Sequence, residues 1–300
     1  MNSASGAAVV VGVDGSEPAL RAVRLAAAEA ARRHRPLRVV HGFIWPLLRV
    51  PPAPPAPPGG GLRHQAEELV AAAVTEAESA APGVRVSGEI IDGEAAAVLL
   101  GESPTAAMIV LGDRGLGGFA ALVVGSVAIQ VAAHADCPVL VARGAQRTVG
   151  PVVVGVDGSA PSRAAVEFAA EEAAVRGTRL HAVHAYTHPH STGPGDMQPL
   201  VYEESLLRDE ENRVLTDALT GLADRHPQVP LTREVVHGRP VGVLTEAART
   251  AQLMVVGGHG RGALSGLLLG SVSQGVLHHA DCPVAVVRCP DGTVGTAAGG

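Results

Sequence analysis

Two copies of one short stretch decide the fold of this chain. Val9–Ser16 reads VVVGVDGS, and Val152–Ser159 reads the same. A second pair of anchors closes each half, because Asp136–Val139 and Asp281–Val284 both read DCPV. A repeat of this length is far too long for a solenoid unit, so each copy is predicted to be a domain in its own right.

The boundary between the copies is expected in the stretch 145–150, between the last strand of one half and the first strand of the next. We therefore predict a first domain over residues 1–146 and a second over residues 147–300. This division agrees with the length of the chain, since 300 residues correspond to about two domains.

Strands and helices are predicted to alternate within each half. Val9–Val13 is an apolar, β-branched run typical of a buried strand, and 16–34 carries apolar residues at helical spacing. Five strands joined by four helices predict an α/β fold of two tandem doubly wound, Rossmann-like parallel sheets. The predicted strands are 9–13, 37–42, 84–91, 108–111, 139–142, 152–156, 180–185, 232–236, 253–257 and 284–288, and the helices are 16–34, 64–81, 95–102, 123–133, 161–176, 201–226, 240–250 and 268–279.

The composition excludes several chemistries. All 23 basic residues are arginine, so the chain lacks the lysine of a P-loop, of an ordinary protein kinase and of a Schiff-base enzyme. A net charge of -6 without a basic stripe gives no support for nucleic-acid binding. The N-terminus lacks the features of a signal peptide, and no apolar run is long enough for a membrane span. We expect a cytoplasmic protein.

Three cysteines do not form a disulfide framework or a zinc ribbon, because the count is odd and no CxxC spacing occurs. Cys137 and Cys282 occupy matching positions before the last strand of each half. Both are expected to be small buried side chains.

The most specific chemical signal is a glycine-rich loop after the fourth strand of each half. Each copy has the pattern Gly-x2-Gly-x9-Gly-Ser, follows an apolar strand and precedes a helix. Glycine allows an anion to approach backbone N–H groups, and a helix N-terminus attracts phosphate. The loops are therefore predicted to hold the phosphates of a nucleotide, through Gly112, Gly115, Gly125, Ser126 and Val127 and through Gly257, Gly260, Gly270, Ser271 and Val272.

Two further loops reach the same edge of each sheet. The turn after the first strand caps the next helix, or presents a carboxylate to a nucleotide or its Mg²⁺, and these two roles are compatible. The turn after the second strand could bind adenine through its backbone and a valine. The residues concerned are Val13, Asp14, Gly15, Ser16 and Val40, and Val156, Asp157, Gly158, Ser159 and Val183. His41 and His184 are expected to be satisfied by backbone groups.

No metal site and no catalytic residue is predicted from the protein alone. His181 and His184 lie three apart in a strand and so face opposite sides, and no cysteine or carboxylate stands at metal-ligand spacing to them, to His188 or to His190. No Ser-His-Asp arrangement or nucleophile elbow occurs. Binding is better supported than turnover.

Proline-rich inserts follow the second strand of each half. The stretch 45–61 contains PPAPPAPPGGG, which cannot pair in a sheet or continue a helix. His188–Leu200 occupies the same place in the second half. The first insert is expected to be a semi-extended loop, with a role as a ligand for a partner module as an alternative.

The strand-turn motif, the glycine loop and the closing CPV strand together resemble the universal stress protein family, in a tandem form that covers nearly the whole chain. The resemblance implies an adenine nucleotide alpha hydrolase-like fold and, from the paired glycine loops, ATP binding at the residues named above. It also implies dimers joined through the last strands, here Val139–Ala142 and Val284–Val287, or the same contact between the two halves of one chain. Asp113 departs from the pattern, since its carboxylate would repel phosphate unless it points away or pairs with Arg114.

Three functions are in competition. The leading hypothesis is an ATP-binding regulator of stress response or growth arrest with an unknown protein partner. The first alternative is a slow ATPase or nucleotidyl-transfer enzyme that depends on Asp14 and Asp157. The second alternative is a nucleotide-free module for protein interaction.

Overall fold

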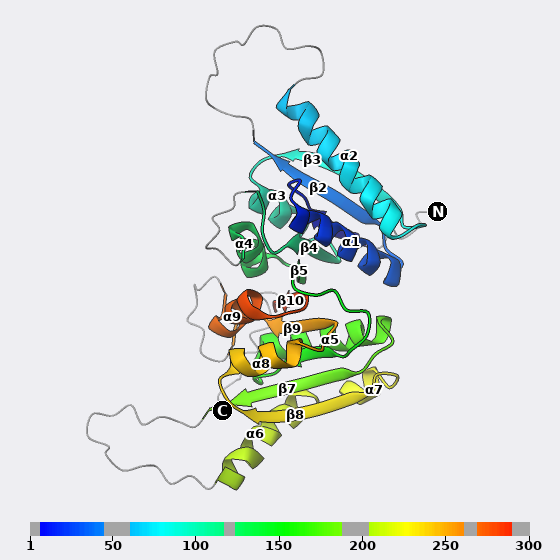
Figure 1. Cartoon of the computed structure of the whole chain (residues 1–300). Coiled ribbons are helices and arrows are strands. Elements are labelled where there is room, and N and C mark those ends of the chain that lie inside the picture. Colours follow the sequence, from blue (N-terminus) through cyan, green and yellow to red (C-terminus); the bar gives the residue numbers. More distant parts are fainter. Residues whose placement is uncertain (1–6, 45–60, 117–123, 188–203, 261–268, 290–300) are drawn as a thin grey trace, which may run out of the picture. The chain divides into compact units, whose positions relative to one another are not determined.

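A computed structural model describes residues 7–44, 61–116, 124–187, 204–260 and 269–289. The chain divides into two compact units, Met1–Gly144 and Ala145–Gly300, and each is described by itself (Figure 1). Residues 45–60 of the proline-rich insert and the whole of His188–Leu200 lie outside the described residues.

Unit 1 contains one parallel sheet in the order β3-β2-β1-β4-β5. Chain order rises in both directions from the central strand β1, which is the signature of a doubly wound sheet. Its elements are β1 (Val9–Gly12), α1 (Glu17–Arg32), β2 (Leu37–Phe43), α2 (Leu62–Ala80), β3 (Val86–Asp92), α3 (Ala95–Glu102), β4 (Met108–Gly112), α4 (Ser126–His134) and β5 (Val139–Ala142).

Unit 2 repeats this sheet in the order β8-β7-β6-β9-β10, again with parallel strands. Its elements are β6 (Val152–Gly155), α5 (Ala160–Val175), β7 (Leu180–Tyr186), α6 (Glu204–Ala218), α7 (Leu222–Arg225), β8 (Leu231–His237), α8 (Pro240–Ala248), β9 (Leu253–Gly257), α9 (Ser271–His279) and β10 (Val284–Val287). The predicted α/β class with parallel, doubly wound sheets is confirmed in both units.

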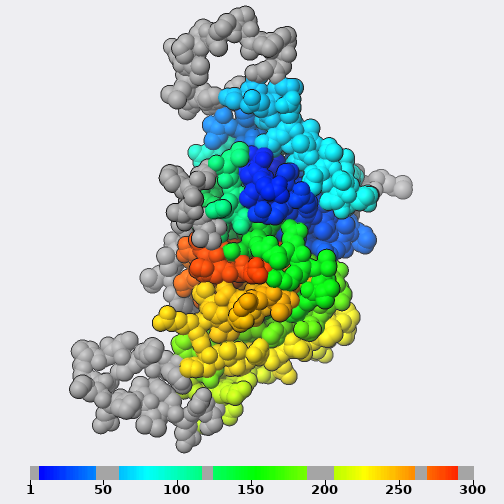
Figure 2. Space-filling view, in the orientation of Figure 1, coloured from blue at the N-terminus to red at the C-terminus, as the bar shows by residue number. Residues whose placement is uncertain are grey.

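Helices cover both faces of each sheet. In unit 1, α1 packs on α2, and α3 packs on α4, as right-handed crossovers require for strands added on opposite sides of β1. The space-filling view shows α1 and α2 lying side by side in unit 1, and α8 against α9 in unit 2 (Figure 2). The inner strands β1 and β4 of unit 1, and β6 and β9 of unit 2, are therefore buried between two helical layers.

The core is formed by the strands together with the buried faces of helices such as α1 and α5. Val9 and Val11 on β1 and Met108 and Ile109 on β4 are all fully buried, which explains why these two strands read as unbroken apolar runs instead of alternating ones. Cys137 and Cys282 are buried, as expected. Burial raises the pKa of the Cys137 thiol to about 12, so this side chain stays neutral.

The prediction of a single helix over 201–226 is wrong. The chain turns between α6 and α7, where Gly221 has φ 71° and precedes the first residue of α7. A left-handed residue interrupts helical hydrogen bonding, and the apolar residues on both sides kept a helical spacing that concealed the break. The helices expected from 123 and 268 begin at Ser126 and Ser271.

The left-handed turn at Gly221 predicts opposite effects for two alanine substitutions in unit 2. Gly221→Ala should lower the free energy of unfolding by about 1 kcal/mol, because an L side chain is strained at positive φ. Gly242→Ala should raise it by about 0.5 kcal/mol, because a Cβ there meets nothing within 4 Å in α8. Urea unfolding followed by circular dichroism measures the free energy of unfolding of both variants. Equal changes in the two variants would contradict the left-handed conformation assigned to Gly221.

Candidate functional site

A hollow of about 290 Å³ opens at the carboxyl edge of the sheet in unit 1. It lies where β1 and β4 are neighbours, with the connection after β1 running one way and that after β4 running the other. Ligands in open α/β sheets bind at such a point. The hollow is lined by Gly12, Val13, Asp14, Ala19, Val40, Gly42, Ala95, Leu99, Leu111, Gly112, Arg114, Gly115, Leu116, Gly125, Ser126, Val127 and Ala128.

Unit 2 has a hollow of about 370 Å³ at the equivalent place. Its walls repeat those of the first hollow almost position by position. They are Gly155, Val156, Asp157, Ser162, Val183, Ala185, Pro240, Leu244, Val256, Gly257, His259, Gly260, Gly270, Ser271, Val272 and Ser273.

Helices α1 and α5 differ from α4 and α9 in how their N-termini at this edge are satisfied. At the start of α1 the Ser16 hydroxyl oxygen accepts from the Ala19 N–H at 3.3 Å, and Ser159 does the same for α5. The starts of α4 and α9 have glycine N-caps, Gly125 and Gly270, with no side-chain hydrogen bond. The first turns of α4 and α9 therefore present backbone N–H groups to the hollows.

The carboxylate of Asp14 joins two of the loops. Its Oδ1 accepts from the Ser16 N–H at 3.0 Å, and its Oδ2 accepts from the Leu116 N–H at 2.8 Å. A Cβ on Gly115 would collide with that same Oδ2, so this position requires glycine. In unit 2, Asp157 accepts from the Ser159 N–H at 2.9 Å.

The first glycine of each loop has a packing role. A Cβ on Gly112 would stand 2.7 Å from the backbone of Pro18, and one on Gly257 would stand 3.0 Å from that of Pro161. Each glycine thus lets the fourth strand of its unit approach the first helix closely. Packing alone accounts for glycine at these two positions, although both line the hollows.

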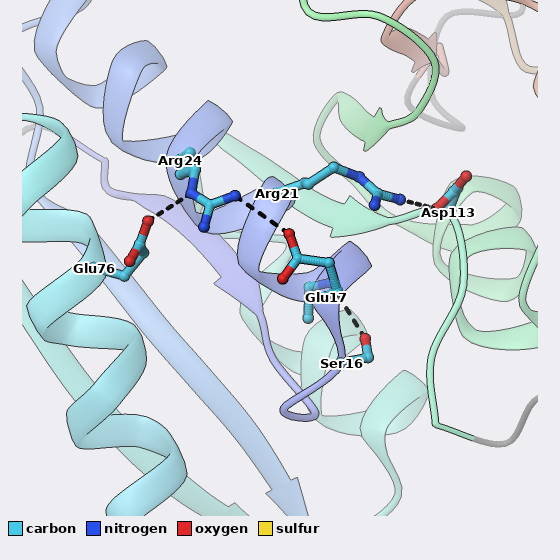
Figure 3. A network of polar contacts seen from close by, with 7 residues as sticks. Ser16, Glu17, Arg21, Arg24, Glu76 and Asp113 are labelled. Carbon is cyan, nitrogen blue, oxygen red and sulfur yellow. Dashed lines mark hydrogen bonds and ion pairs between the residues drawn. The ribbon is translucent and has the colours of Figure 1, made fainter.

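Asp113 turns away from the hollow. Its Oδ1 pairs with Nη2 of Arg21 on α1 at 3.2 Å (Figure 3). Arg114, and not Asp113, is among the residues that line the hollow. In the same view, Arg24 on α1 extends to Glu76 and Glu17. The Asp113 carboxylate is therefore not among the groups that line the hollow. Sequence reasoning considered Arg114 as the partner and missed Arg21.

His41 on β2 and His184 on β7 are held by backbone groups, which confirms that prediction. Nδ1 of His41 lies 2.8 Å from the carbonyl oxygen of Val13, and Nδ1 of His184 lies 2.6 Å from that of Val156. Nε2 of His184 also contacts Oε2 of Glu211 at 2.6 Å. These contacts tie the second strand of each unit to the turn that carries the aspartate.

Most of the residues predicted from sequence line the two hollows, but Gly15, Ser16, Gly158 and Ser159 do not. Sequence reasoning also missed one wall. It comes from α3 in unit 1 and from α8 in unit 2, through Ala95, Leu99, Pro240 and Leu244. The order of the elements could have predicted this wall, because the helix after the third strand must start at the same edge of the sheet.

Within the described part of the chain, no group of three His, Cys, Asp or Glu residues is gathered as for a metal ion. In that same part no helix combines the length and the apolar character of a membrane span. His181 pairs with Glu234 at 3.0 Å, whereas His188 and His190 lie outside the described residues.

Comparison with known proteins agrees with this architecture. The model of the universal stress protein family matches residues 7–143 and again 148–288. Universal stress protein Rv1996 of Mycobacterium tuberculosis is 38% identical over 311 residues, which cover 94% of this chain and 95% of that protein. Universal stress protein Rv2005c of the same organism is 38% identical over 290 residues, with 93% and 96% covered.

A solved structure supports the fold. The crystal structure of a universal stress protein from Archaeoglobus fulgidus superposes with a TM-score of 0.68 at 19% sequence identity, and covers 94% of this chain and 98% of its own. The family model matches both halves, and the curated relatives match over nearly their full length. The chain therefore belongs to the universal stress protein family, as a tandem of two such domains.

Proposed function

We propose that this protein binds ATP in both hollows and acts as a nucleotide-dependent regulator of stress response or growth arrest. The observation that carries the proposal is the repeated site. Each unit places the same residue types around a hollow at the carboxyl edge of its own sheet. The helices whose first residues line these hollows, α4 and α9, have no side-chain cap.

The phosphates are assigned to the starts of α4 and α9. Gly125, Ser126 and Val127 line the first hollow, and Gly270, Ser271 and Val272 line the second. Free N–H groups at a helix N-terminus and the positive end of its dipole favour an anion. A polyphosphate supplies the acceptors that these N–H groups lack among the described residues.

The adenine is assigned to the apolar side of each hollow. Val40 and Leu99 line it in unit 1, and Val183 and Leu244 line it in unit 2, with both valines almost fully buried. Mostly apolar walls with a few polar groups at one end are the usual make-up of a small-molecule site. An adenine base and a charged tail match these two ends.

No observation favours the enzyme alternative over binding. Asp14 and Asp157 would lie beside the ribose and phosphates, where Mg²⁺ carried by the nucleotide would also lie. Both carboxylate oxygens of Asp14 accept hydrogen bonds from backbone N–H groups, so the side chain has a structural role. Dimers through Val139–Ala142 and Val284–Val287, a regulatory partner and a cytoplasmic location stay predictions from the sequence.

Calorimetry with ATP tests the proposal directly. We expect the wild type to bind about two ATP per chain with micromolar affinity, equivalent to about 8 kcal/mol. The Gly125→Glu and Gly270→Glu variants should each lose one site, and the double variant both, because each places a carboxylate at the helix start. A Cβ on Gly125 has no neighbour nearer than 3.6 Å, so this variant is expected to fold.

Gly101→Glu is the matched control, since it adds the same charge in α3 at a position where a Cβ meets nothing within 4 Å. It should bind ATP like the wild type. Absence of binding by the wild type, or unchanged binding by the double variant, would reject the proposal.

The Arg21–Asp113 pair yields a second prediction for unit 1. Arg21→Ala should weaken ATP binding at the first site about two- to fivefold, because it releases the Asp113 carboxylate toward the phosphates. Arg24→Ala removes the same charge from the same helix but breaks contacts with Glu76 and Glu17, and should leave both sites unchanged. Calorimetry in the Gly270→Glu background isolates the first site. An equal effect of the two variants would show that net charge, and not the pair, is responsible.

A further inference from the structure

The two hollows differ in one charged lining residue. Aligned through the glycine loop, Arg114 in unit 1 corresponds to His259 in unit 2, and each lines its hollow. The neighbouring glycines Gly115 and Gly260 each approach the carboxylate of the aspartate in their own unit. The same backbone framework therefore presents an arginine to one hollow and a histidine to the other.

These two side chains respond differently to pH. Arginine keeps its positive charge throughout the physiological range, whereas histidine ordinarily changes its charge between about pH 5 and pH 8. A cation beside a phosphate strengthens binding, because it adds a charge-assisted hydrogen bond. A neutral imidazole offers a weaker interaction.

We infer that Arg114 and His259 give the two sites different proton dependence, so that the second site binds an anionic nucleotide more tightly as the pH falls while the first does not share this change. The inference rests on the proposed function, since it concerns the regulation of the same sites. The sign follows from linkage: the bound anion favours the protonated imidazole, so affinity is greatest at low pH and is lost as the pH rises.

The charged groups around His259 come from four elements, β6, β7, α6 and β10, or from the residues that follow them. Arg288 follows β10 and lies against Gly258, and Asp157 follows β6 and lies against Gly260. Farther along the same edge, His184 on β7 contacts Glu211 on α6. Arg261 follows in the sequence and lies outside the described residues. Arg288 and Asp157 are present in the wild type and in the exchanged variants alike, so they do not distinguish these proteins.

The effect of His259 must be separated from that of two other groups, the terminal phosphate of the ligand and His184. The terminal phosphate of the ligand gains a proton near about pH 6, but it does so at both sites alike. His184 has its counterpart in His41, and both contact a backbone carbonyl through Nδ1. Exchange of Arg114 and His259 between the sites therefore tests the assigned residues without changing these histidines.

The experiment measures ADP binding by calorimetry at about pH 8 and about pH 6 without divalent cations, so that no metal takes part. The Gly125→Glu variant reports on the second site and the Gly270→Glu variant on the first. We expect the affinity ratio between the two pH values to be about three- to tenfold larger at the second site. His259→Arg should remove this excess, and Arg114→His should create it at the first site.

Thermal unfolding at both pH values verifies that the exchanged variants remain folded. Equal ratios at the two sites, or an excess that persists in His259→Arg, would overturn the inference and leave the proposed function intact. Absence of ADP and ATP binding at both sites and both pH values would overturn the proposed function itself.

Discussion

The starts of α4 and α9 are the constraint on which the rest of the site depends. A helix leaves its first N–H groups without internal partners, and an N-cap side chain can supply an acceptor for one of them. Ser16 and Ser159 do so for α1 and α5, whereas Gly125 and Gly270 cannot. The sheet topology brings these glycine-capped starts to the edge where the strand order reverses, so the unmet N–H groups face a hollow and not the core.

Much of this arrangement could be predicted from sequence, because it depends on local chemistry. Unbroken apolar runs such as Val9–Val11 predicted buried parallel strands, and the internal repeat predicted two units of one fold. The loops after the first and fourth strands of each unit also met as expected. Contacts between distant elements were harder to predict. Nothing local indicates that Arg21 turns to Asp113, that Asp14 accepts from Leu116, or that Gly221 breaks a helix whose apolar spacing continues.

Duplication explains why small differences between the units are informative. Both hollows are lined by glycines of the fourth-strand loop, an aspartate and a buried valine at equivalent positions. These positions therefore have the same role in the two units. Arg114 and His259 differ within that shared framework. His184 likewise contacts Glu211 in addition to the carbonyl group that both copies share. Two sites in one chain thus provide an internal comparison for every substitution.

Amide NMR of the whole protein during a titration with ATP tests the central claim most directly, since it observes the N–H groups themselves. The account predicts the largest shifts, and slowed hydrogen exchange, at Ser126–Ala128 and Ser271–Ser273. Shifts confined to other parts of the chain, with these N–H groups unchanged at saturating ATP, would contradict it.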